Sequence, residues 1–206
     1  MARYTGPVCK KCRTEEQKLF LKGERCYTNK CSVAKRAYPP GQHGQARKKP
    51  SEYALHLREK QKVRNTYLVL EKQFAKYFEQ AERKTGVTGT ILLQILESRF
   101  DNVLYQSGLV SSRKQARQLI RHRHFLINGK LVDIPSYRLK PSDEIAVKAK
   151  SQKTIKDIIE VQTVTPQPKW LSVDKDALKV RIESLPERED LSPNIKEHLI
   201  IEYYSK

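Results

Sequence analysis

Four cysteines, the only ones in the chain, lie close together near its start. Cys9 and Cys12 form a C-x-x-C pair, and Cys26 and Cys31 form a second pair with four residues between them. A C-x-x-C turn directs two sulfurs at one ion, and a loop that returns a second pair completes a tetrahedral shell. The spacing therefore predicts a structural site for one zinc ion, although four thiolates also suit an iron–sulfur cluster. Four protein ligands leave no position open for water, so a catalytic metal is not expected.

Disulfide bonds and unpaired thiols are the other two states open to these cysteines. No apolar run approaches the length that spans a bilayer, and the first residues, MARYTGPVCKK, lack the apolar core of a secretory signal. We therefore expect a reducing, cytoplasmic environment, where clustered thiols favour a metal over disulfides. Basic residues around the two pairs favour the thiolate form, namely Lys10, Lys11, Arg13, Lys22, Arg25 and Lys30.

Positive charge is the second chemical feature of the sequence. The 206 residues include 41 Lys and Arg against 23 Asp and Glu, which gives a net charge of +18. Residues 1–50 carry 13 basic against 3 acidic residues, whereas residues 151–206 carry 9 against 10. This excess predicts a nucleic-acid partner and strongly salt-dependent binding. A membrane surface is a weaker alternative because no strongly amphipathic basic helix has a bulky apolar face, and a basic surface without a partner is the remaining one.

One stretch, SSRKQARQLIRHRHFLINGKLVDIPSYRLKPSDEIAVK (Ser111–Lys148), combines this charge with clear structural signals. Ser112 and Gln115 have the spacing of a capping box at a helix start. The helix then has a basic face made by Arg113, Lys114, Arg117 and Arg121. A neighbouring apolar face is made by Ala116, Leu119 and Ile120. We expect the apolar face to pack and the guanidinium groups to make bidentate contacts with phosphates.

A small antiparallel sheet is expected after this helix. Asn128-Gly129 separates FLI from KLV, and this dipeptide favours the type I′ turn of a two-residue hairpin. KPSDEIAVK has the pattern of a turn followed by another strand. An arginine-rich helix set against a small antiparallel sheet is typical of a compact RNA-reading module.

Helices are expected to dominate the chain before Ser111. Ser51 is the expected N-cap of a helix in which Arg58 with Lys62, and Lys60 with Arg64, have i, i+4 spacing. These pairs form a basic ridge suited to phosphates, or else an ordinary solvated face. A stripe of core residues at helical spacing follows before Gly86 and consists of Leu70, Phe74, Tyr77, Phe78 and Ala81. One or two further helices are expected up to Gly108.

The segments that flank these elements are less regular. Arg36–Ser51, rich in proline, glycine and basic residues, predicts an extended loop that an anionic partner could order, or a flexible linker. TVTPQPKWL is a proline-broken connector that includes Trp170. Ser192-Pro193 predicts a helix start, while HLIIEYY fits a helix or a strand. The nearly neutral charge of this last part suggests packing on the body or on a neighbouring protein.

At Ser111–Lys148 the sequence resembles a known family. SSRKQARQLIRHRHFLINGKLVDIPSY closely resembles the RNA-binding module named after small-subunit ribosomal protein four. MARYTGP, PPGQHG, LREKQKVR, LEKQFAKYF, FDNVLY and EHLIIEYYSK are similar to further segments of that family, in order along essentially the whole chain. The chain thus resembles the bacterial type of this family, in the branch that keeps the four-cysteine metal site.

The resemblance implies an α+β fold with an N-terminal four-cysteine metal knot, a helical body and an inserted small α/β RNA-binding module. That module would combine the arginine-rich helix with an antiparallel sheet. Residues 1–45 would be the metal-binding extension, and residues 46–96 the helical rRNA-binding body. Residues 97–165 would be the inserted module, and residues 166–206 a connector and C-terminal segment that returns to the body.

The resemblance also implies a function on the cytoplasmic ribosome. Members of this family are structural constituents of the small (30S) subunit that bind 16S rRNA directly, nucleate assembly of the subunit body and contribute to translational accuracy with ribosomal protein five. Arg47-Lys48-Lys49 matches, though not letter for letter, the family segment near the mRNA entry path. We therefore expect 16S rRNA, mRNA near that path and ribosomal protein five as partners, with no membrane and no small-molecule substrate.

The expected site residues are the four cysteines as metal ligands and a set of cationic residues as RNA contacts. The RNA contacts would be Arg3, Lys10, Lys11, Arg13, Lys22, Arg36, His43, Arg47, Lys48, Lys49, Arg58, Lys60, Lys62, Arg64, Arg113, Lys114, Arg117, Arg121, His122, Arg123 and Lys130.

Two other classes of protein share single features with this chain. Pseudouridine synthases contain the same module, and SRFD (Ser98–Asp101) is superficially similar to their catalytic Arg-Leu-Asp run. Here Phe100 replaces the leucine, Asp101 precedes the module, and the roughly 40 residues after the module are too few for an ordinary catalytic domain. Asp101 is thus expected to begin a helix, and the chain is not expected to be an enzyme.

A zinc-containing transcription factor that reads duplex DNA is the second alternative. The cysteine stretch lacks the helix and histidine pair of a zinc finger, and the chain has no dimerising heptads. A folded rRNA recognised by its shape is therefore the expected ligand.

Overall fold

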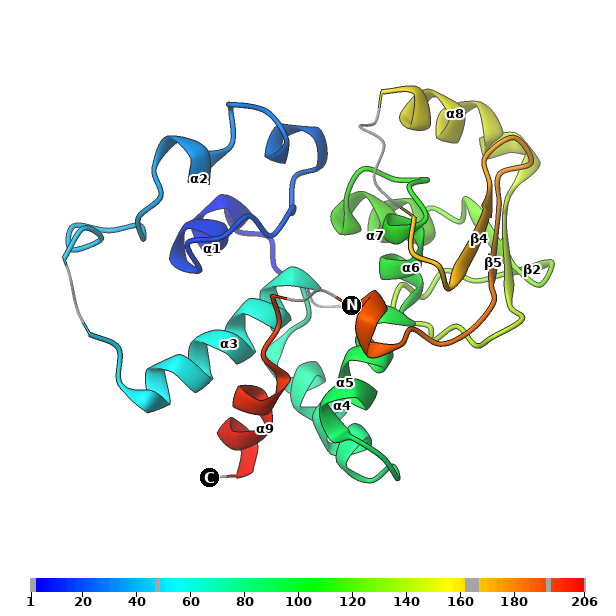
Figure 1. The fold of residues 1–206 in the computed structure, drawn as a ribbon. Coiled ribbons are helices and arrows are strands. Elements are labelled where there is room, and N and C mark those ends of the chain that lie inside the picture. Colours follow the sequence, from blue (N-terminus) through cyan, green and yellow to red (C-terminus); the bar gives the residue numbers. More distant parts are fainter. Residues whose placement is uncertain (1–2, 47–48, 162–166, 192–193, 206) are drawn as a thin grey trace. The chain divides into compact units, whose positions relative to one another are not determined.

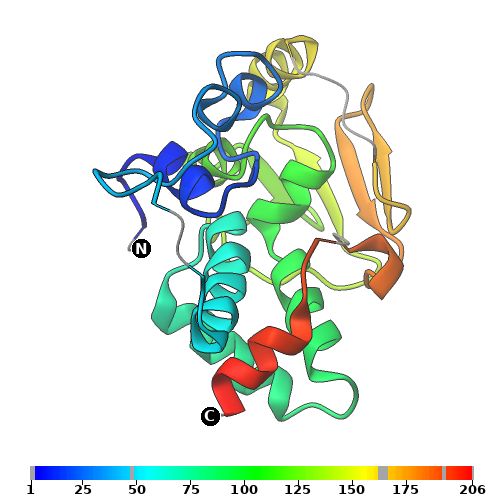
Figure 2. The same ribbon diagram turned by 60° about the vertical axis from the view of Figure 1, so that its left-hand side comes forward.

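Figures 1 and 2 show the computed structural model of the chain, which describes residues 3–46, 49–161, 167–191 and 194–205. The described residues form two compact units. The first contains the residues up to 92 and those from 194 onward, and the second contains the residues between 93 and 191. The second unit is therefore an insertion in the first along the chain.

The described part of the first unit is helical. Its elements are α1 (Val8–Thr14), the 3₁₀ helix η1 (Gly23–Cys26), α2 (Ser32–Lys35), α3 (Glu52–Thr66), α4 (Glu71–Glu82), the start of α5 (Thr88–Glu97) and α9 (Glu197–Ser205). The expected cap of α3 is confirmed, because Ser51 Oγ accepts a hydrogen bond from the N–H of Ala54 (3.3 Å). On α4, four residues of the expected stripe are buried, but Leu70 is exposed at the N-cap position.

Residues 197–205 form helix α9, where the sequence had fitted helix or strand equally. This helix lies along α3 (Figures 1 and 2). Glu202 Oε2 lies 2.9 Å from Nε2 of the buried His56 on α3, and the Tyr204 ring stacks on Phe78 with the centroids 4.3 Å apart. The helix begins at Glu197, and the expected start at Ser192-Pro193 lies outside the described residues.

A small apolar cluster attaches the N-terminal part to the end of α3. It consists of Val8, Cys12, Leu19, Leu21 and Leu68. Beside it, the buried side chain of Asn65 accepts a hydrogen bond from Lys11 Nζ (2.7 Å) and donates one to Glu15 Oε1 (3.3 Å). Burial raises the pKa of the Glu15 carboxyl above its ordinary value, against the opposing effect of the Asn65 hydrogen bond.

The second unit combines helices with an antiparallel sheet, as expected for an α+β fold. Its described elements are the end of α5, α6 (Phe100–Gln106), α7 (Arg113–Arg121), β1 (Phe125–Ile127), β2 (Lys130–Leu131), β3 (Glu144–Val147), η2 (Ala149–Ser151), α8 (Gln152–Glu160), β4 (Leu171–Asp174), β5 (Lys179–Ile182) and η3 (Arg188–Asp190). Over these residues five strands form one sheet in the order β2-β1-β3-β5-β4, with every neighbouring pair antiparallel.

The hairpin predicted at Asn128-Gly129 is confirmed. Both residues have positive φ, 49° and 76°, which is the backbone that a type I′ turn requires. Asn128 Oδ1 also accepts a hydrogen bond from the N–H of Glu144 (2.9 Å), so the turn is held to the start of β3.

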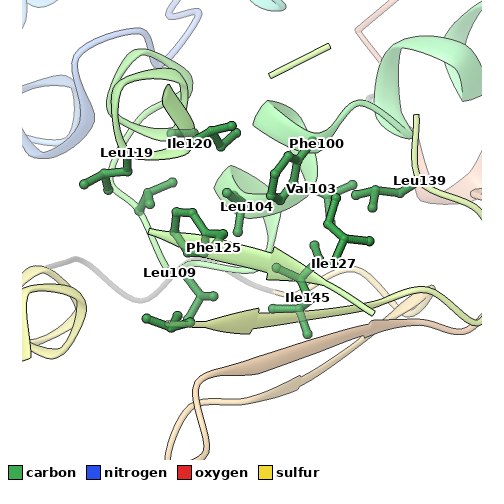
Figure 3. Close-up of a cluster of buried hydrophobic side chains, with 14 of the residues drawn as sticks. Phe100, Val103, Leu104, Leu109, Leu119, Ile120, Phe125, Ile127, Leu139 and Ile145 are labelled. Atoms are coloured by element: carbon green, nitrogen blue, oxygen red, sulfur yellow. The ribbon is translucent and has the colours of Figure 1, made fainter. Parts of the chain in front are cut away.

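One apolar core lies between the sheet and helices α6 and α7. Figure 3 shows side chains of both helices gathered over β1 and β3, and the Phe100 and Phe125 rings meet edge to face with centroids 6.2 Å apart. The expected apolar face of α7, Ala116, Leu119 and Ile120, is buried in this core. The same cluster includes Trp170 and Val180, from the connector and β5.

The segment expected to run as one piece from 166 to 206 is divided between the two units. Strands β4 and β5 extend the sheet of the second unit, because β5 pairs with β3 in a register that places Ile145 opposite Val180. Only the part from 194 onward belongs with the helical body. The pairing covers what would otherwise be an open edge of β3.

Candidate nucleic-acid interface

Eleven of the residues expected to contact RNA are exposed in the described structure. They are Arg3, Lys10, Lys22, Arg36, His43, Lys49, Arg58, Arg121, His122, Arg123 and Lys130. Arg47 and Lys48 lie outside the described residues. Exposed ammonium and guanidinium groups on both units can neutralise phosphates at little desolvation cost.

The basic ridge expected on α3 is wrong in one respect, because three of its four cations face the protein. Lys60 is buried, with Nζ 2.6 Å from Glu71 Oε1 and 4.6 Å from the ring centroid of Tyr203. Lys62 Nζ lies 2.7 Å from Glu59 Oε1, and Arg64 donates to Glu71 Oε2 (3.1 Å). Helical spacing placed these residues correctly relative to one another, but it carried no information about the carboxylates and the helix that cover them.

Helix α7 also differs from the expectation, since its first two arginines are anchored within the protein. Arg113 is buried, where it donates through Nε to Asn102 Oδ1 (2.8 Å) and lies over the Tyr105 ring. Arg117 Nε donates to Asp101 Oδ2 (2.6 Å). Both arginines therefore hold α7 against α6, while Lys114 is half-buried.

Asp101 is the centre of this anchoring network. Its carboxylate is 1% exposed and accepts two hydrogen bonds from Arg99, at 3.0 and 2.8 Å, in addition to the one from Arg117. Asp101 lies in the first turn of α6, so its expected role as a helix-start residue is confirmed. A carboxylate enclosed by two guanidinium groups is not accessible to a substrate.

The start of α7 confirms only half of the expected capping box. Ser112 Oγ accepts a hydrogen bond from the N–H of Gln115 (3.3 Å), as an N-cap does. The Gln115 side chain, however, accepts from the N–H of Ser111 (2.8 Å). The helix is thus held by its cap, by the buried Arg113 and by the half-buried Arg117.

The C-terminal end of α7 presents exposed basic residues of the module. Arg121 and His122 are exposed, and Arg123, which has a φ of 62°, is exposed and pairs with Asp133 (3.2 Å). Cations at a helix C-terminus are favoured by the helix dipole. Anchoring at one end and exposed charge at the other give a rigid, positively charged projection.

In the N-terminal part, two expected RNA contacts also have partners within the protein. Lys11 binds Asn65 and lies over the Tyr4 ring (3.9 Å to its centroid). Arg13 donates through Nε to the carbonyl of Tyr38 (3.0 Å), and so holds the start of the proline-rich loop.

The four cysteines are free thiols, of which Cys12, Cys26 and Cys31 are buried. Within the described ranges, no group of three or more His, Cys, Asp or Glu side chains is arranged to hold a metal ion. The expected four-cysteine knot is therefore not formed as a coordination site in this structure.

The surroundings of Cys12 and Cys26 have opposing effects on their thiolate forms. The Sγ of Cys26 accepts a hydrogen bond from the N–H of Lys22 (3.4 Å). Burial raises the pKa values of the Cys12 and Cys26 thiols, and the nearby thiols raise them further. A thiolate at either position would thus be favoured by a bound cation, which offsets both effects.

Sequence reasoning missed His124, Lys148 and Ser151, which meet beside the end of α7. His124 Nδ1 is 2.8 Å from Ser151 Oγ, and the N–H of Lys148 donates to the carbonyl of His124 (2.9 Å). The run Arg-His-Arg-His was a signal for His124, but nothing local joins residue 124 to residue 148.

A scaffolded cationic helix on an antiparallel sheet defines an RNA-binding protein of the S4-domain class, and residues 98–145 match the S4 domain family. Residues 3–97 match the Ribosomal protein S4/S9 N-terminal domain family. Small ribosomal subunit protein uS4 of Acetivibrio thermocellus is 57% identical over 208 residues, and that of Ruminiclostridium cellulolyticum is 58% identical over 208 residues, with both chains fully covered in each comparison. The chain belongs to the family of small ribosomal subunit protein uS4.

Among the described residues, no helix is long and apolar enough to cross a bilayer.

Proposed function

We propose that the chain is a structural protein of the small ribosomal subunit that binds 16S rRNA directly. Membership of the uS4 family supports this assignment, and the cationic end of α7 is the observation that carries it. Arg121, His122 and Arg123 are exposed at the end of α7, which is held to α6 by the Arg117–Asp101 ion pair and the Arg113–Asn102 hydrogen bond. Because the helix backbone is already held in place, ordering it costs little on binding, which favours a folded RNA whose phosphates match this end of α7.

The family is one of structural proteins, and the chain is not an enzyme. The residue closest to a catalytic role in the sequence, Asp101, is enclosed by Arg99 and Arg117. This geometry argues against the pseudouridine synthase alternative.

Further parts of the proposal concern partners within the subunit. The family resemblance favours nucleation of the subunit body, contact with ribosomal protein five, a contribution to translational accuracy, and mRNA near Arg47-Lys48-Lys49. The near-neutral charge of residues 151–206 is compatible with a protein-facing surface there.

A competition experiment tests the proposed function. Purified chain bound to labelled 16S rRNA at physiological salt should resist an excess of duplex DNA, because shape-matched phosphates add to non-specific attraction. The dissociation constants for the two nucleic acids are measured by filter binding. Equal affinity for rRNA and duplex DNA would contradict the proposal and favour a general polyanion binder.

We also propose that Cys9, Cys12, Cys26 and Cys31 hold one zinc ion. The proposal is supported by their spacing, by the burial of three of them and by the N–H donor to Cys26. A closed four-thiolate site supplies structural stabilisation, since its ligands come from separate turns of the chain.

Metal analysis tests this site. Protein purified without oxygen should contain about one zinc per chain, and Cys9→Ser should release it and increase hydrogen exchange in residues 3–46 without affecting α4. The substitution Ser32→Ala, next to a proposed ligand, is the control and should retain the metal. Several irons per chain would identify an iron–sulfur cluster, and neither metal would exclude the site.

A further inference from the structure

The turn after α7 and the 3₁₀ helix η2 form one rigid surface in the second unit. The N–H of Lys148 donates to the carbonyl of His124 (2.9 Å), and the N–H of Ser151 donates to the carbonyl of Lys148 (2.8 Å). The His124 ring is fixed by the contact between its Nδ1 and Ser151 Oγ (2.8 Å). Ser151 is buried, so this contact lies on the inner side of the surface.

Cationic groups gather on the outer side of the same surface. The rings of His122 and His124 have centroids 6.1 Å apart, and Lys148 is exposed beside them. Arg121 and Lys150, which are neighbours of His122 and Lys148 in sequence, are also exposed.

The basic groups around His124 favour a bound anion. The pKa of His124 is lowered from its ordinary value, first by burial and then by His122 and Lys148. Both charged groups that act on His124 are thus cationic, while Arg123 is directed to Asp133. An anion placed among these groups would relieve their mutual repulsion and reverse the effect on His124.

We propose that His122, His124 and Lys148 bind a phosphate of the RNA backbone and that binding is accompanied by proton uptake. The inference rests on the proposed function and extends it from His122, an expected RNA contact, to His124 and Lys148, which the sequence pattern did not assign. A phosphodiester offers only acceptor oxygens, and Lys148 and two protonated imidazoles offer only donors. With Nδ1 of His124 on Ser151, its Nε2 is the nitrogen left for the phosphate.

The sign of the pH dependence follows from linkage. In the free protein His124 titrates below the ordinary value of about 6.5, and a bound phosphate raises that pKa. The RNA complex therefore binds more protons than the free protein over the range between the two pKa values. Affinity for RNA should rise as the pH falls from 8 to 6 and level off below the pKa of the free protein.

Affinity measurements on the full chain test the site. Dissociation constants for 16S rRNA are measured at pH 6 and pH 8 at fixed ionic strength, and as a function of salt. Lys148→Gln should weaken binding several-fold and lower the salt slope by about one phosphate contact. His124→Gln and His122→Gln should each reduce the pH dependence. The matched controls are the exposed residues Lys175 and His198, whose Gln variants should behave as the unmodified chain.

The outcomes separate this inference from the function on which it rests. If the unmodified chain binds rRNA but Lys148→Gln keeps its affinity and salt slope, the site is excluded and the proposed function stands. A pH dependence that survives in both histidine variants also overturns the inference. Because His124→Gln could disturb the contact with Ser151, its melting temperature is compared with that of Lys148→Gln. Failure of the unmodified chain to bind rRNA would overturn both proposals.

Discussion

Arg117 and Arg121 lie one helical turn apart on α7 and yet have opposite surroundings. Arg117 faces a carboxylate that is 1% exposed, whereas Arg121 projects from the end of the helix. A buried carboxylate needs charged or polar partners, because its desolvation is costly without them. The two arginines are therefore expected to differ in what they contribute, the first to stability and the second to binding.

Alanine substitutions separate these two contributions. Arg117→Ala should lower the free energy of unfolding by about 1–3 kcal/mol, since Asp101 loses one of its charged donors. Arg121→Ala should change it by less than about 0.5 kcal/mol, as is usual at exposed positions, but should reduce the salt slope of rRNA binding by about one. Urea denaturation and salt titrations of both variants provide the measurements. A stable Arg117→Ala variant with a reduced slope would show that Arg117 contacts phosphate instead.

At the residue scale, the sequence predicted which residues pack or form a turn better than it predicted the hydrogen-bond partners of charged residues. The apolar face of α7 and the turn at Asn128-Gly129 follow from local spacing, and both are confirmed. Arg113 was assigned to phosphate because its spacing matches Arg121, but its partner Asn102 lies on another helix. Periodicity identifies which residues share a face and gives no information about what covers that face.

At the scale of elements, α9 shows how a helix is fixed by a segment remote in sequence. Gly89, in the first turn of α5, leaves room for it: a Cβ at this position would lie 2.8 Å from Glu197 Cβ and 2.7 Å from Glu197 Cγ. Neither atom is the free end of a flexible side chain, so the backbone of α9 would have to move.

Gly89→Ala should therefore destabilise the first unit by about 1–3 kcal/mol through overpacking, although alanine favours helices by about 1 kcal/mol over glycine. Hydrogen exchange should show reduced protection in α9, and thermal denaturation should show a lower melting temperature. Thr90→Ala, in the same turn of α5, is the control and should leave both unchanged. An increased melting temperature for Gly89→Ala would mean that helix propensity outweighs the steric contact.

Elements whose signals are local were predicted well, and those formed by distant pairing were not. The cap at Ser51 and the stripe on α4 need only neighbouring residues. The pairing of β3 with β5 joins residues near 145 to residues near 180, with α8 between them in sequence. No local pattern in the connector predicts which strand it will join, so residues 171–182 were placed with the wrong unit.

At the scale of the whole molecule, composition was the most informative feature. A net charge of +18 with few acidic residues in the first quarter favoured a nucleic-acid partner before any element was considered. Composition counts buried and exposed cations alike, however. Lys60, Lys62 and Arg113 contribute to the total and are buried against protein partners, so the charge available to a polyanion is smaller than the formal value.

The division of the first unit between the two ends of the chain has a consequence for its synthesis. Residues 93–191 emerge in one continuous run, so the inserted unit has all its own strands and helices before α9 exists. Until α9 is made, Lys60 has no Tyr203 beneath it and His56 has no Glu202. A growing chain thus leaves Lys60 and His56 on α3 without these partners until α9 has been translated, while Lys60 already has its carboxylate partner Glu71 on α4.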